Sequence, residues 1–215
     1  MRTDNRPATG TRLEALALRS IRGDAVHVGA GGGLVHLQFR RFAGCPICSV
    51  HLQSFVRRYG EVIRAGVREI VVFHSSQAEL LRYAGDLPFD VVADPHKQLY
   101  RRFGVEAAPR ALLNPRAWPG VLWSVLRVAA EVVFSGKPMP PLRPAGGSWG
   151  LPADFLIGDG QILACRYGKH ADDQWSVDEM LNLARPHTRT QISGPELEQR
   201  VDAIPRKGGS ILPRE

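Results

Sequence analysis

The sequence has 215 residues, 44% of them hydrophobic and 23% charged, and a formal net charge of +7 at pH 7. These values are ordinary for a soluble globular protein with one well-buried core. The positive charge is moderate and the arginines are dispersed along the chain, so we expect no specific nucleic-acid binding.

The cysteines and the apolar segments indicate the compartment. Three cysteines cannot form a closed disulfide framework. The start of the chain lacks the continuous apolar core of a secretory signal. The most apolar stretch, residues 117–134, contains Pro119, Arg127 and Glu131 and therefore fails as a membrane-spanning helix. We expect a cytoplasmic protein in a reducing setting, with no membrane association.

The chain begins with a segment of low apolar content. Residues 1–20 are expected to form an N-terminal extension ahead of the folded domain. Within it, Leu13 and Leu16 at helical spacing predict a short amphipathic turn or helix. Residues 25–28 predict a short strand, which a glycine-rich turn follows.

The central feature of the sequence is residues 34–48, LVHLQFRRFAGCPIC. Its first residues form an apolar run typical of a buried strand. After Cys48 the apolar residues recur at helical spacing, and Pro46 takes the first-turn position that proline favours. The apolar positions of this predicted helix are Leu52, Phe55, Val56, Tyr59, Val62 and Ile63. Two cysteines therefore stand where a helix begins.

This position has chemical consequences for the thiols. A helix N-terminus presents unpaired N–H groups and roughly half a positive charge, which stabilise a thiolate. Arg40 and Arg41 precede it and can add to the same field. We expect the pKa of Cys45 to fall from about 8.5 towards about 6 to 7. Cys45, expected to be the more exposed thiol, is the predicted nucleophile, and Cys48 is placed to resolve a disulfide or sulfenic acid formed on it.

Strands and helices then alternate. Residues 67–74 and 89–93 predict two buried strands. A capping box at residues 76–79 opens a helix between them, and Asp94 caps a further helix that we expect to begin at Pro95. This order favours a parallel-type sheet covered on both faces.

Residues 105–150 interrupt the pattern. Apolar residues on one face of the stretch from 122 to 133 predict an inserted amphipathic helix, and packing on its own domain is favoured over a dimer contact or a wall over the active site.

Residues 152–163, PADFLIGDGQIL, predict a proline, a strand, a tight turn and a second strand. Cys165 follows, and a lone strand cysteine is expected to be a buried, inert packing residue.

The end of the chain carries one more element. A capping box at residues 176–179 opens a final helix that Pro186 stops. Residues 188–215 are rich in proline, glycine and charge, and we expect them to form a flexible tail.

The strand–CPIC–helix unit resembles the active site of the thioredoxin superfamily. Together, FRRFAGCPIC and PADFLIGDGQI look most similar to the peroxiredoxin-like branch of the alkyl hydroperoxide reductase and thiol-specific antioxidant family. The resemblance spans roughly residues 24–185. It implies an α/β, thioredoxin-like three-layer fold over residues 21–187. The central mixed sheet would have helices on both faces, with the amphipathic helix as an insertion.

The resemblance also implies a function. It predicts an antioxidant oxidoreductase that reduces peroxides through a Cys45 thiolate, with Cys48 as resolving cysteine and no cofactor or metal. Pro152 matches the superfamily's cis-proline. The expected substrate-binding residues are Pro46, Pro152, Arg40 and Arg41. The implied partners are a peroxide or disulfide substrate and an external thiol reductant such as a thioredoxin-type protein, and a homodimer is left open.

One departure from the family keeps alternatives open. Standard peroxiredoxins carry threonine or serine three residues before the peroxidatic cysteine, and this chain has Phe42 before Cys45 and Cys45 before Cys48. Which cysteine is peroxidatic is therefore not decided, and general dithiol–disulfide exchange is the second enzymatic hypothesis. A non-catalytic binding module, or a zinc site with His51 as third ligand, is the remaining class.

Overall fold

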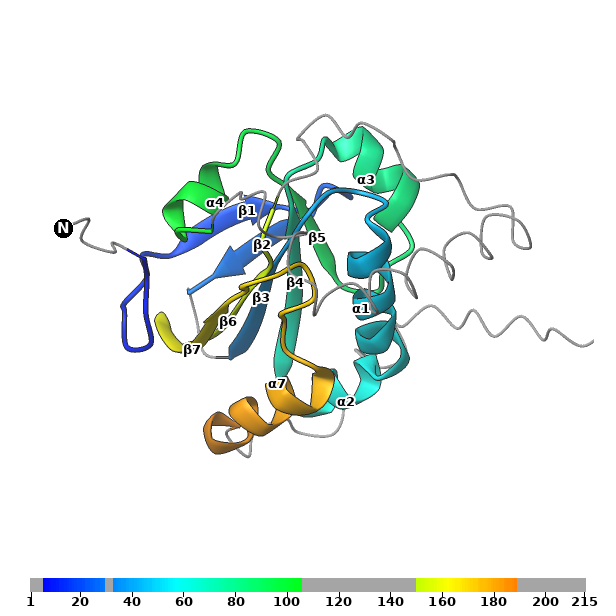
Figure 1. Cartoon of the computed structure of the whole chain (residues 1–215). Coiled ribbons are helices and arrows are strands. Elements are labelled where there is room, and N and C mark those ends of the chain that lie inside the picture. Colours follow the sequence, from blue (N-terminus) through cyan, green and yellow to red (C-terminus); the bar gives the residue numbers. More distant parts are fainter. Residues whose placement is uncertain (1–5, 30–32, 106–149, 189–215) are drawn as a thin grey trace, which may run out of the picture.

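The computed structural model describes residues 6–29, 33–105 and 150–188 (Figure 1). The inserted helix expected within residues 105–150 and the tail expected over residues 188–215 lie outside this description, apart from their end residues. Within the described ranges, no helix is long and apolar enough to cross a membrane.

A five-stranded sheet with the order β5-β4-β3-β6-β7 forms the centre of the described fold. Its strands are β3 (Leu34–Arg40), β4 (Val67–Phe73), β5 (Asp90–Ala93), β6 (Ala153–Gly158) and β7 (Gln161–Tyr167). The first three are mutually parallel, and β6 and β7 run antiparallel to their neighbours. The mixed sheet of the expected thioredoxin-like fold is therefore confirmed.

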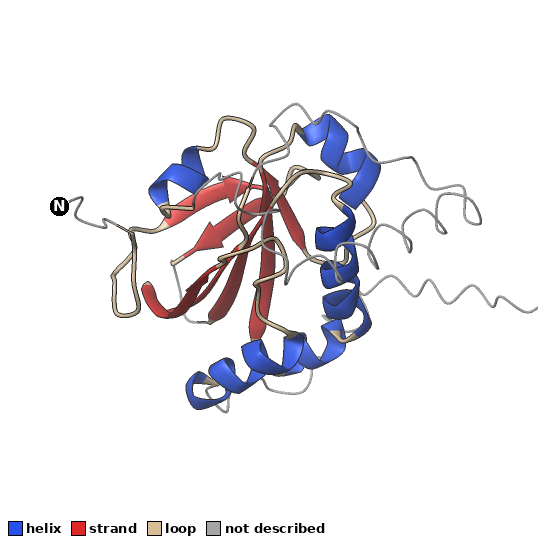
Figure 2. Cartoon of the chain, in the orientation of Figure 1, coloured by secondary structure: helices blue, strands red, loops and turns tan. Residues whose placement is uncertain are grey.

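Helices cover one face of this sheet, and a β-hairpin and a short helix cover the other (Figures 1 and 2). The first face carries α1 (Pro46–Arg57), α2 (Tyr59–Arg64), α3 (Gln77–Ala84) and α7 (Val177–Ala184). The second carries β1 (Leu16–Arg19), β2 (Ala25–Val28) and α4 (Gln98–Arg102). A short 3-10 helix, Arg185–His187, follows α7. Two separate apolar cores result, one on each side of the sheet.

The N-terminal segment contains a strand where a turn or helix was expected. Residues Leu16–Arg19 pair antiparallel with β2. Leu16 is buried and Leu18 is half-buried, whereas the residues between and after them are exposed. This alternation has the period of a strand, so the apolar residues face the core from an extended backbone.

The predicted helix signals are confirmed at two helices and displaced at a third. Ser76 and Ser176 each form a complete capping box, at α3 and α7. The helix expected from Pro95 begins instead at Gln98, after a left-handed Lys97. The Asp94 carboxylate accepts hydrogen bonds from the backbone N–H groups of Gln98 and Leu99, both at 2.8 Å. Asp94 is thus the expected capping residue, acting across an intervening turn.

Candidate active site

The two cysteines lie at the beginning of α1, directly after the central strand of the sheet. Cys45 is the N-cap residue of the helix, and Pro46 is in its first turn as predicted. Gly44 has a φ of 77°, which lets the chain turn from β3 into the helix. The backbone N–H of Ser49 donates to the Cys45 carbonyl at 2.9 Å and closes the first turn.

The expectation that Cys45 is the more exposed thiol is wrong, because both thiols are buried. The exposed fraction is 1% for Cys45 and 3% for Cys48. The Cys45 side chain is directed at the Cys48 thiol and at Arg41, whose Nη1 atom lies 3.7 Å from Sγ. All three cysteines of the chain are free thiols in this structure.

The surroundings separate the two thiols by acidity. Burial opposes ionisation of Cys45, but the Cys48 hydrogen bond, the Arg41 charge and the helix N–H groups outweigh it and lower the pKa of Cys45 to about 7. Burial raises the pKa of Cys48 well above its ordinary value, and its position beside Cys45 adds to the rise. Of the two thiols, Cys45 is therefore the one that ionises near neutral pH, and Cys48 stays protonated and donates a hydrogen bond to it.

The end of β4 holds the loop that carries the active-site arginine. The backbone N–H of His74 donates to the Arg41 carbonyl at 3.3 Å. The backbone N–H of Ala43 donates to the hydroxyl of Ser75 at 2.9 Å. These bonds fix the loop on both sides of Phe42, so Arg41 is placed against Cys45 by the neighbouring strand.

The structure separates the two arginines that the sequence placed together. Arg41 contacts Cys45, whereas Arg40 is fully buried on the helical face of the sheet. Arg40 donates to Asp154 at 2.6 Å and also to Gln38. Arg40 is the last residue of β3 and Arg41 is the first residue of the loop that leads to α1, which explains why these neighbours in sequence have different partners.

Arg40 belongs to a buried polar cluster that sequence reasoning missed. The His36 Nδ1 atom lies 3.0 Å from Glu69, and its Nε2 atom lies 3.3 Å from Asp154. Burial alone would lower the pKa of His36, but the Glu69 and Asp154 carboxylates raise it to about 9. From His36 onwards, every second residue of β3 is polar, and these three side chains (His36, Gln38 and Arg40) lie on the same face of the sheet. That alternation inside an apolar run is the sequence signal that could have found the cluster.

The imidazole of His51 also turns inward, towards the buried polar cluster. Its Nε2 atom lies 3.0 Å from the Arg40 guanidinium, and its ring packs on Phe55 at 5.1 Å between centroids. Burial, followed by the Arg40 charge, lowers the pKa of His51 well below its ordinary value. His51 is therefore a neutral acceptor for Arg40, and it anchors α1 to the polar cluster.

Pro152 lies at the expected place but with a different peptide geometry. Ala153 pairs with Phe39, and this pairing places Pro152 beside the C-terminal end of β3, as predicted. The expectation of a cis bond is wrong, because no peptide bond between described residues is cis. The trans form is the intrinsic preference of an X-Pro bond, by about 0.5–1 kcal/mol.

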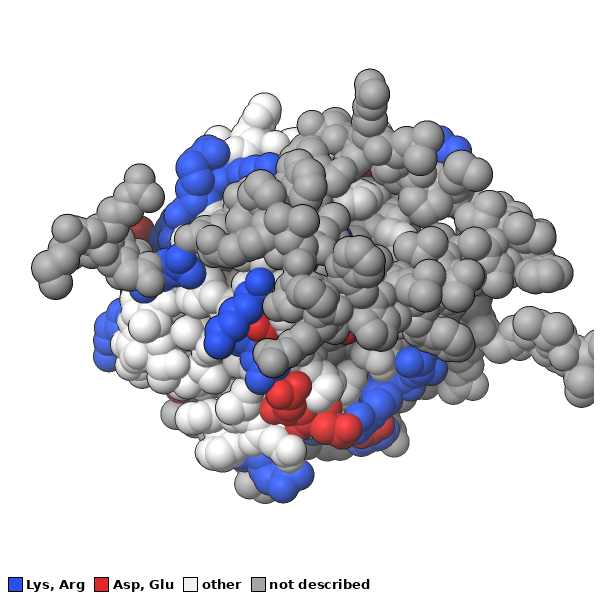
Figure 3. Space-filling view, viewed as in Figure 1, with Lys and Arg blue, Asp and Glu red and all other residues white. Residues whose placement is uncertain are grey.

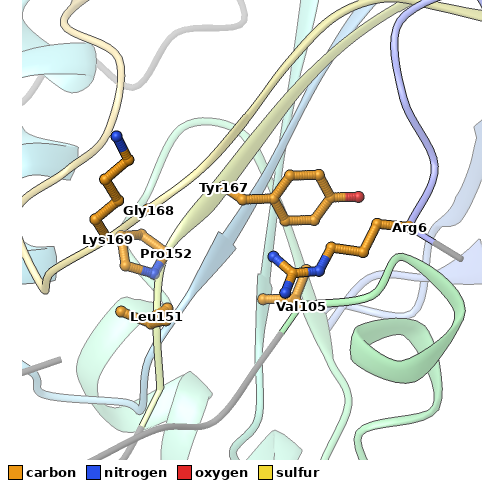
Figure 4. A pocket seen from close by; sticks show the side chains of 7 residues that line it. All are labelled: Arg6, Val105, Leu151, Pro152, Tyr167, Gly168 and Lys169. Carbon is orange, nitrogen blue, oxygen red and sulfur yellow. The ribbon is translucent and has the colours of Figure 1, made fainter. Parts of the chain in front are cut away.

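A cavity of about 310 Å³ opens beside Pro152 (Figure 4). Arg6 reaches it from the N-terminal segment and lies over the Tyr167 ring at 5.4 Å. Its described lining also includes Val105, Leu151, Gly168 and Lys169. The cavity thus combines apolar walls with two cationic side chains.

The third cysteine is far from this arrangement in the sheet. Cys165 lies on β7 opposite Phe155, and it is half-buried rather than buried as expected. Its Sγ atom is 4.0 Å from the Thr9 hydroxyl.

On the face shown in Figure 3, the described Lys and Arg side chains form separate groups, with Asp and Glu among them in the lower part.

A comparison with known protein families shows which family this chain belongs to. The sequence profile of a family described as "AhpC/TSA antioxidant enzyme" matches residues 54–171, more than half of the chain. The chain belongs to the AhpC/TSA antioxidant enzyme family. It is accordingly a thiol-dependent oxidoreductase of the peroxiredoxin type. The matched range begins after Cys45 and Cys48, so the roles of the two thiols depend on their geometry.

Solved structures share the fold at low sequence identity. Peroxidoxin BcpB from Mycobacterium tuberculosis is 16% identical with a TM-score of 0.58, and the match covers 84% of this chain and 97% of that protein. Peroxiredoxin Q from Xanthomonas campestris is 16% identical with a TM-score of 0.55, covering 82% and 98%. A putative thiol:disulfide interchange protein DsbE from Chlorobium tepidum is 17% identical with a TM-score of 0.50, covering 92% and 98%. No curated protein matches the sequence.

Proposed function

We propose that the protein reduces hydroperoxides with Cys45 as the peroxidatic cysteine and Cys48 as the resolving cysteine. The Cys45 thiolate attacks the terminal oxygen of ROOH, the O–O bond breaks, and the electron pair leaves on RO⁻, which takes a proton from solvent. Cys45 becomes a sulfenic acid, Cys–SOH. The Cys48 thiol then displaces water from it and forms the Cys45–Cys48 disulfide.

The observation that carries this proposal is that the surroundings shift the pKa values of Cys45 and Cys48 in opposite directions. The pKa of Cys45 is lowered to about 7, while that of Cys48 is raised. A nucleophile must be ionised at working pH, whereas a resolving thiol has to ionise only after the first has been oxidised. Burial is the largest cause of the raised pKa of Cys48, and the negative charge of Cys45 adds to it; oxidation of Cys45 removes that added part.

Arg41 is proposed as the substrate-facing cation. Its guanidinium lies against the Cys45 sulfur and so stands where negative charge moves from sulfur to the leaving oxygen. Arg40 is proposed to act behind it, since its contacts are with Asp154, Gln38 and His51. Substrate contact by Arg40, which the sequence suggested, stays a prediction without a supporting contact.

The two prolines are proposed to border the bound substrate. Pro46 fixes the first turn of α1 next to the thiolate. Pro152 lies at the same edge of the sheet and lines the cavity with Leu151 and Arg6. We propose that this cavity receives the organic part of a hydroperoxide, with its apolar walls against carbon chains and its cations near any carboxylate.

Turnover requires a reductant from outside the chain. We propose a thioredoxin-type dithiol protein that reduces the Cys45–Cys48 disulfide in a cytoplasmic, reducing setting. The same two thiols would also serve dithiol–disulfide exchange, and Phe42 in the position of the family's hydroxyl keeps that second function in consideration.

The deciding experiment is a competition on the reduced protein. Equal concentrations of cumene hydroperoxide and of a protein disulfide are offered, and the first-turnover rates of both are measured by rapid quenching. We expect the hydroperoxide to be consumed at least tenfold faster, and a Cys45→Ser variant to consume neither. A faster reaction with the protein disulfide would replace peroxide reduction by disulfide exchange.

A further inference from the structure

A tyrosine hydroxyl joins the ends of two neighbouring strands at the edge of the sheet where the active-site loop begins. Tyr100 belongs to α4, which covers the face of the sheet opposite α1 (Figure 1). Its hydroxyl donates to the carbonyl oxygen of Arg40, the last residue of β3, and to that of Val72 in β4 at 3.0 Å. The one hydroxyl proton is therefore shared between two backbone carbonyls.

The surroundings of Tyr100 fix this hydroxyl and keep it protonated. The Asp94 carboxylate accepts from the backbone N–H of Tyr100 at 3.3 Å, and the Phe39 ring packs edge-on to its ring at 5.0 Å between centroids. Burial, followed by the Cys48 and Asp94 charges, raises the pKa of Tyr100 well above its ordinary value. The hydroxyl therefore stays a donor over the whole range in which Cys45 ionises.

The peptide group that Tyr100 holds faces both active-site thiols. This group joins Arg40 to Arg41, and its N–H, which belongs to Arg41, hydrogen-bonds Cys48. The side chain of Arg41 places its Nη1 atom 3.7 Å from the Sγ atom of Cys45. Both contacts depend on the rotation of one peptide group, so a bond to its carbonyl acts on both thiols.

Arg41 is thus held through the carbonyls on both of its sides. The Tyr100 hydroxyl binds the carbonyl of Arg40, and the backbone N–H of His74 binds the carbonyl of Arg41 itself at 3.3 Å. The second bond is between backbone groups and does not depend on the side chain at position 74. The first needs a donor at the end of a long, rigid side chain. Residue 100 is therefore a position at which side-chain chemistry determines the placement of Arg41.

We propose that Tyr100 is a positioning residue for the active-site thiols: it fixes the peptide before Arg41 so that the guanidinium faces Cys45 and the N–H faces Cys48. Tyr100 acts through Arg41 and not by contact with substrate. The inference concerns the acidity of the thiols, so it goes beyond peroxide reduction and is tested without a peroxide. In the proposed cycle, Cys45 ionises before attack and Cys48 ionises before resolution, and the one hydroxyl supports both steps.

The test is the pH profile of Cys45 alkylation in Tyr100→Phe, which loses the hydroxyl and keeps the ring. We expect the iodoacetamide rate at pH 6 to fall about 3- to 10-fold, because a displaced Arg41 no longer favours the thiolate. At pH 10 the rate should stay within about twofold of wild type, since the thiolate is then fully formed in both. Peptide mass spectrometry assigns the reaction to Cys45. Tyr59→Phe, which removes a hydroxyl from α2, is the matched control and should change neither rate.

Two further backgrounds show whether Tyr100 acts through the peptide. In Arg41→Gln, the added Tyr100→Phe change should leave the Cys45 profile within about twofold, since the cation that it positions is already gone. A second, independent fall in the double variant would overturn this route. In Cys45→Ser, Tyr100→Phe should slow alkylation of Cys48 at pH 9 about threefold or more, because the N–H no longer faces that sulfur. An unchanged Cys48 rate would contradict the shared action on both thiols.

A measurement on the wild-type protein covers the case in which Tyr100→Phe does not fold. The Tyr100 hydroxyl proton should give a slowly exchanging NMR resonance whose shift follows the ionisation of Cys45 near pH 7. A hydroxyl proton that exchanges rapidly, or whose shift ignores this ionisation, would overturn the proposal.

Failure of this inference is distinguishable from failure of the proposed function. Identical Cys45 profiles in wild type and Tyr100→Phe would make the inference wrong, and peroxide reduction would stand. An equal loss of rate at pH 6 and pH 10 would make Tyr100 a structural residue and also overturn the inference. A wild-type protein that does not react with peroxide would overturn the proposed function, and the alkylation profiles would still decide the role of Tyr100.

Discussion

The Nη1 atom of Arg41 lies 3.7 Å from the Sγ atom of Cys45, and the two residues are the beginning and end of one short loop. The loop is held by bonds from the end of β4, so the arginine does not depend on its own flexibility to reach the thiol. A cation is thereby fixed beside a thiol at a helix N-terminus, and both influences favour the thiolate.

Removing this cation should make Cys45 less acidic. Since an opposite charge within contact distance favours the ionised form, we expect Arg41→Gln to raise the pKa of Cys45 by about one pH unit or more. The measurement is the iodoacetamide rate of Cys45 from pH 5 to 10, followed by peptide mass spectrometry. Arg57→Gln, at the exposed far end of α1, is the matched control and should leave the pKa near 7. An unchanged pKa in Arg41→Gln would remove Arg41 from the mechanism.

Oxidation should link the first two cysteines and leave the third free. Cys45 and Cys48 are three residues apart in the first turn of α1, whereas Cys165 lies on β7, two strands from β3. We expect one equivalent of hydrogen peroxide to produce an internal Cys45–Cys48 disulfide, seen by peptide mapping without reduction. The Cys165→Ser variant should give the same product at the same rate. A dominant bond to Cys165, within or between molecules, would contradict the assignment of Cys48.

The buried polar cluster should make stability depend on pH in the alkaline range. The folded pKa of His36 is about 9, above its unfolded value of about 6.5. The ring therefore contributes stability that is fully present below about pH 6.5 and is lost as the pH rises through about 9. Over this range the contribution is on the order of 3 kcal/mol. Cys45, with a lowered pKa, acts in the opposite direction, so a difference between variants is the proper measure.

The difference is obtained from urea unfolding of wild type and His36→Gln at pH 6 and pH 9. We expect the gap in unfolding free energy between them to shrink markedly at pH 9. His96→Gln removes an exposed histidine and should show no such change. A gap that stays constant with pH would mean that His36 is neutral in the folded protein.

Two glycines should respond in opposite ways to the same substitution. A Cβ atom at Gly168 would lie 2.7 Å from both the Asp173 carbonyl oxygen and the Pro152 ring. Gly168→Ala should therefore destabilise the fold by about 1–3 kcal/mol. At Gly60, in α2, the Cβ atom would meet the Arg64 side chain at an ordinary 3.5 Å. Gly60→Ala should stabilise by about 0.5–1 kcal/mol. Thermal unfolding measures both, and equal effects would contradict the close approach of Gly168 to Pro152.

Much of the fold could be predicted because its signals are local. The apolar runs that form β3 and β4, the Asp159–Gly160 turn and the two serine capping boxes each act within a few residues. Errors arose where one pattern fits two structures. The spacing of Leu13 and Leu16 suits a helical turn, but pairing with β2 makes the segment a strand.

The site was predictable in its residues but not in their partners. The position of Cys45 and Pro46 at a helix start follows from the sequence, whereas the burial of Cys45 depends on tertiary packing. The pairing of Arg40 with Asp154 joins residues that are 114 positions apart, and only the register of β3 with β6 brings them together.

The most direct test of the central claim is to find which sulfur receives the peroxide oxygen. The reduced Cys48→Ser variant keeps a hydroxyl donor beside Cys45 and cannot form the internal disulfide. It is treated with one equivalent of hydrogen peroxide in the presence of dimedone, which traps sulfenic acid, and is mapped by mass spectrometry. We expect stoichiometric labelling of Cys45, and no labelling of Cys48 in the matched Cys45→Ser variant. Labelling of Cys48 in Cys45→Ser, with Cys45 unlabelled in Cys48→Ser, would reverse the two roles and contradict the claim.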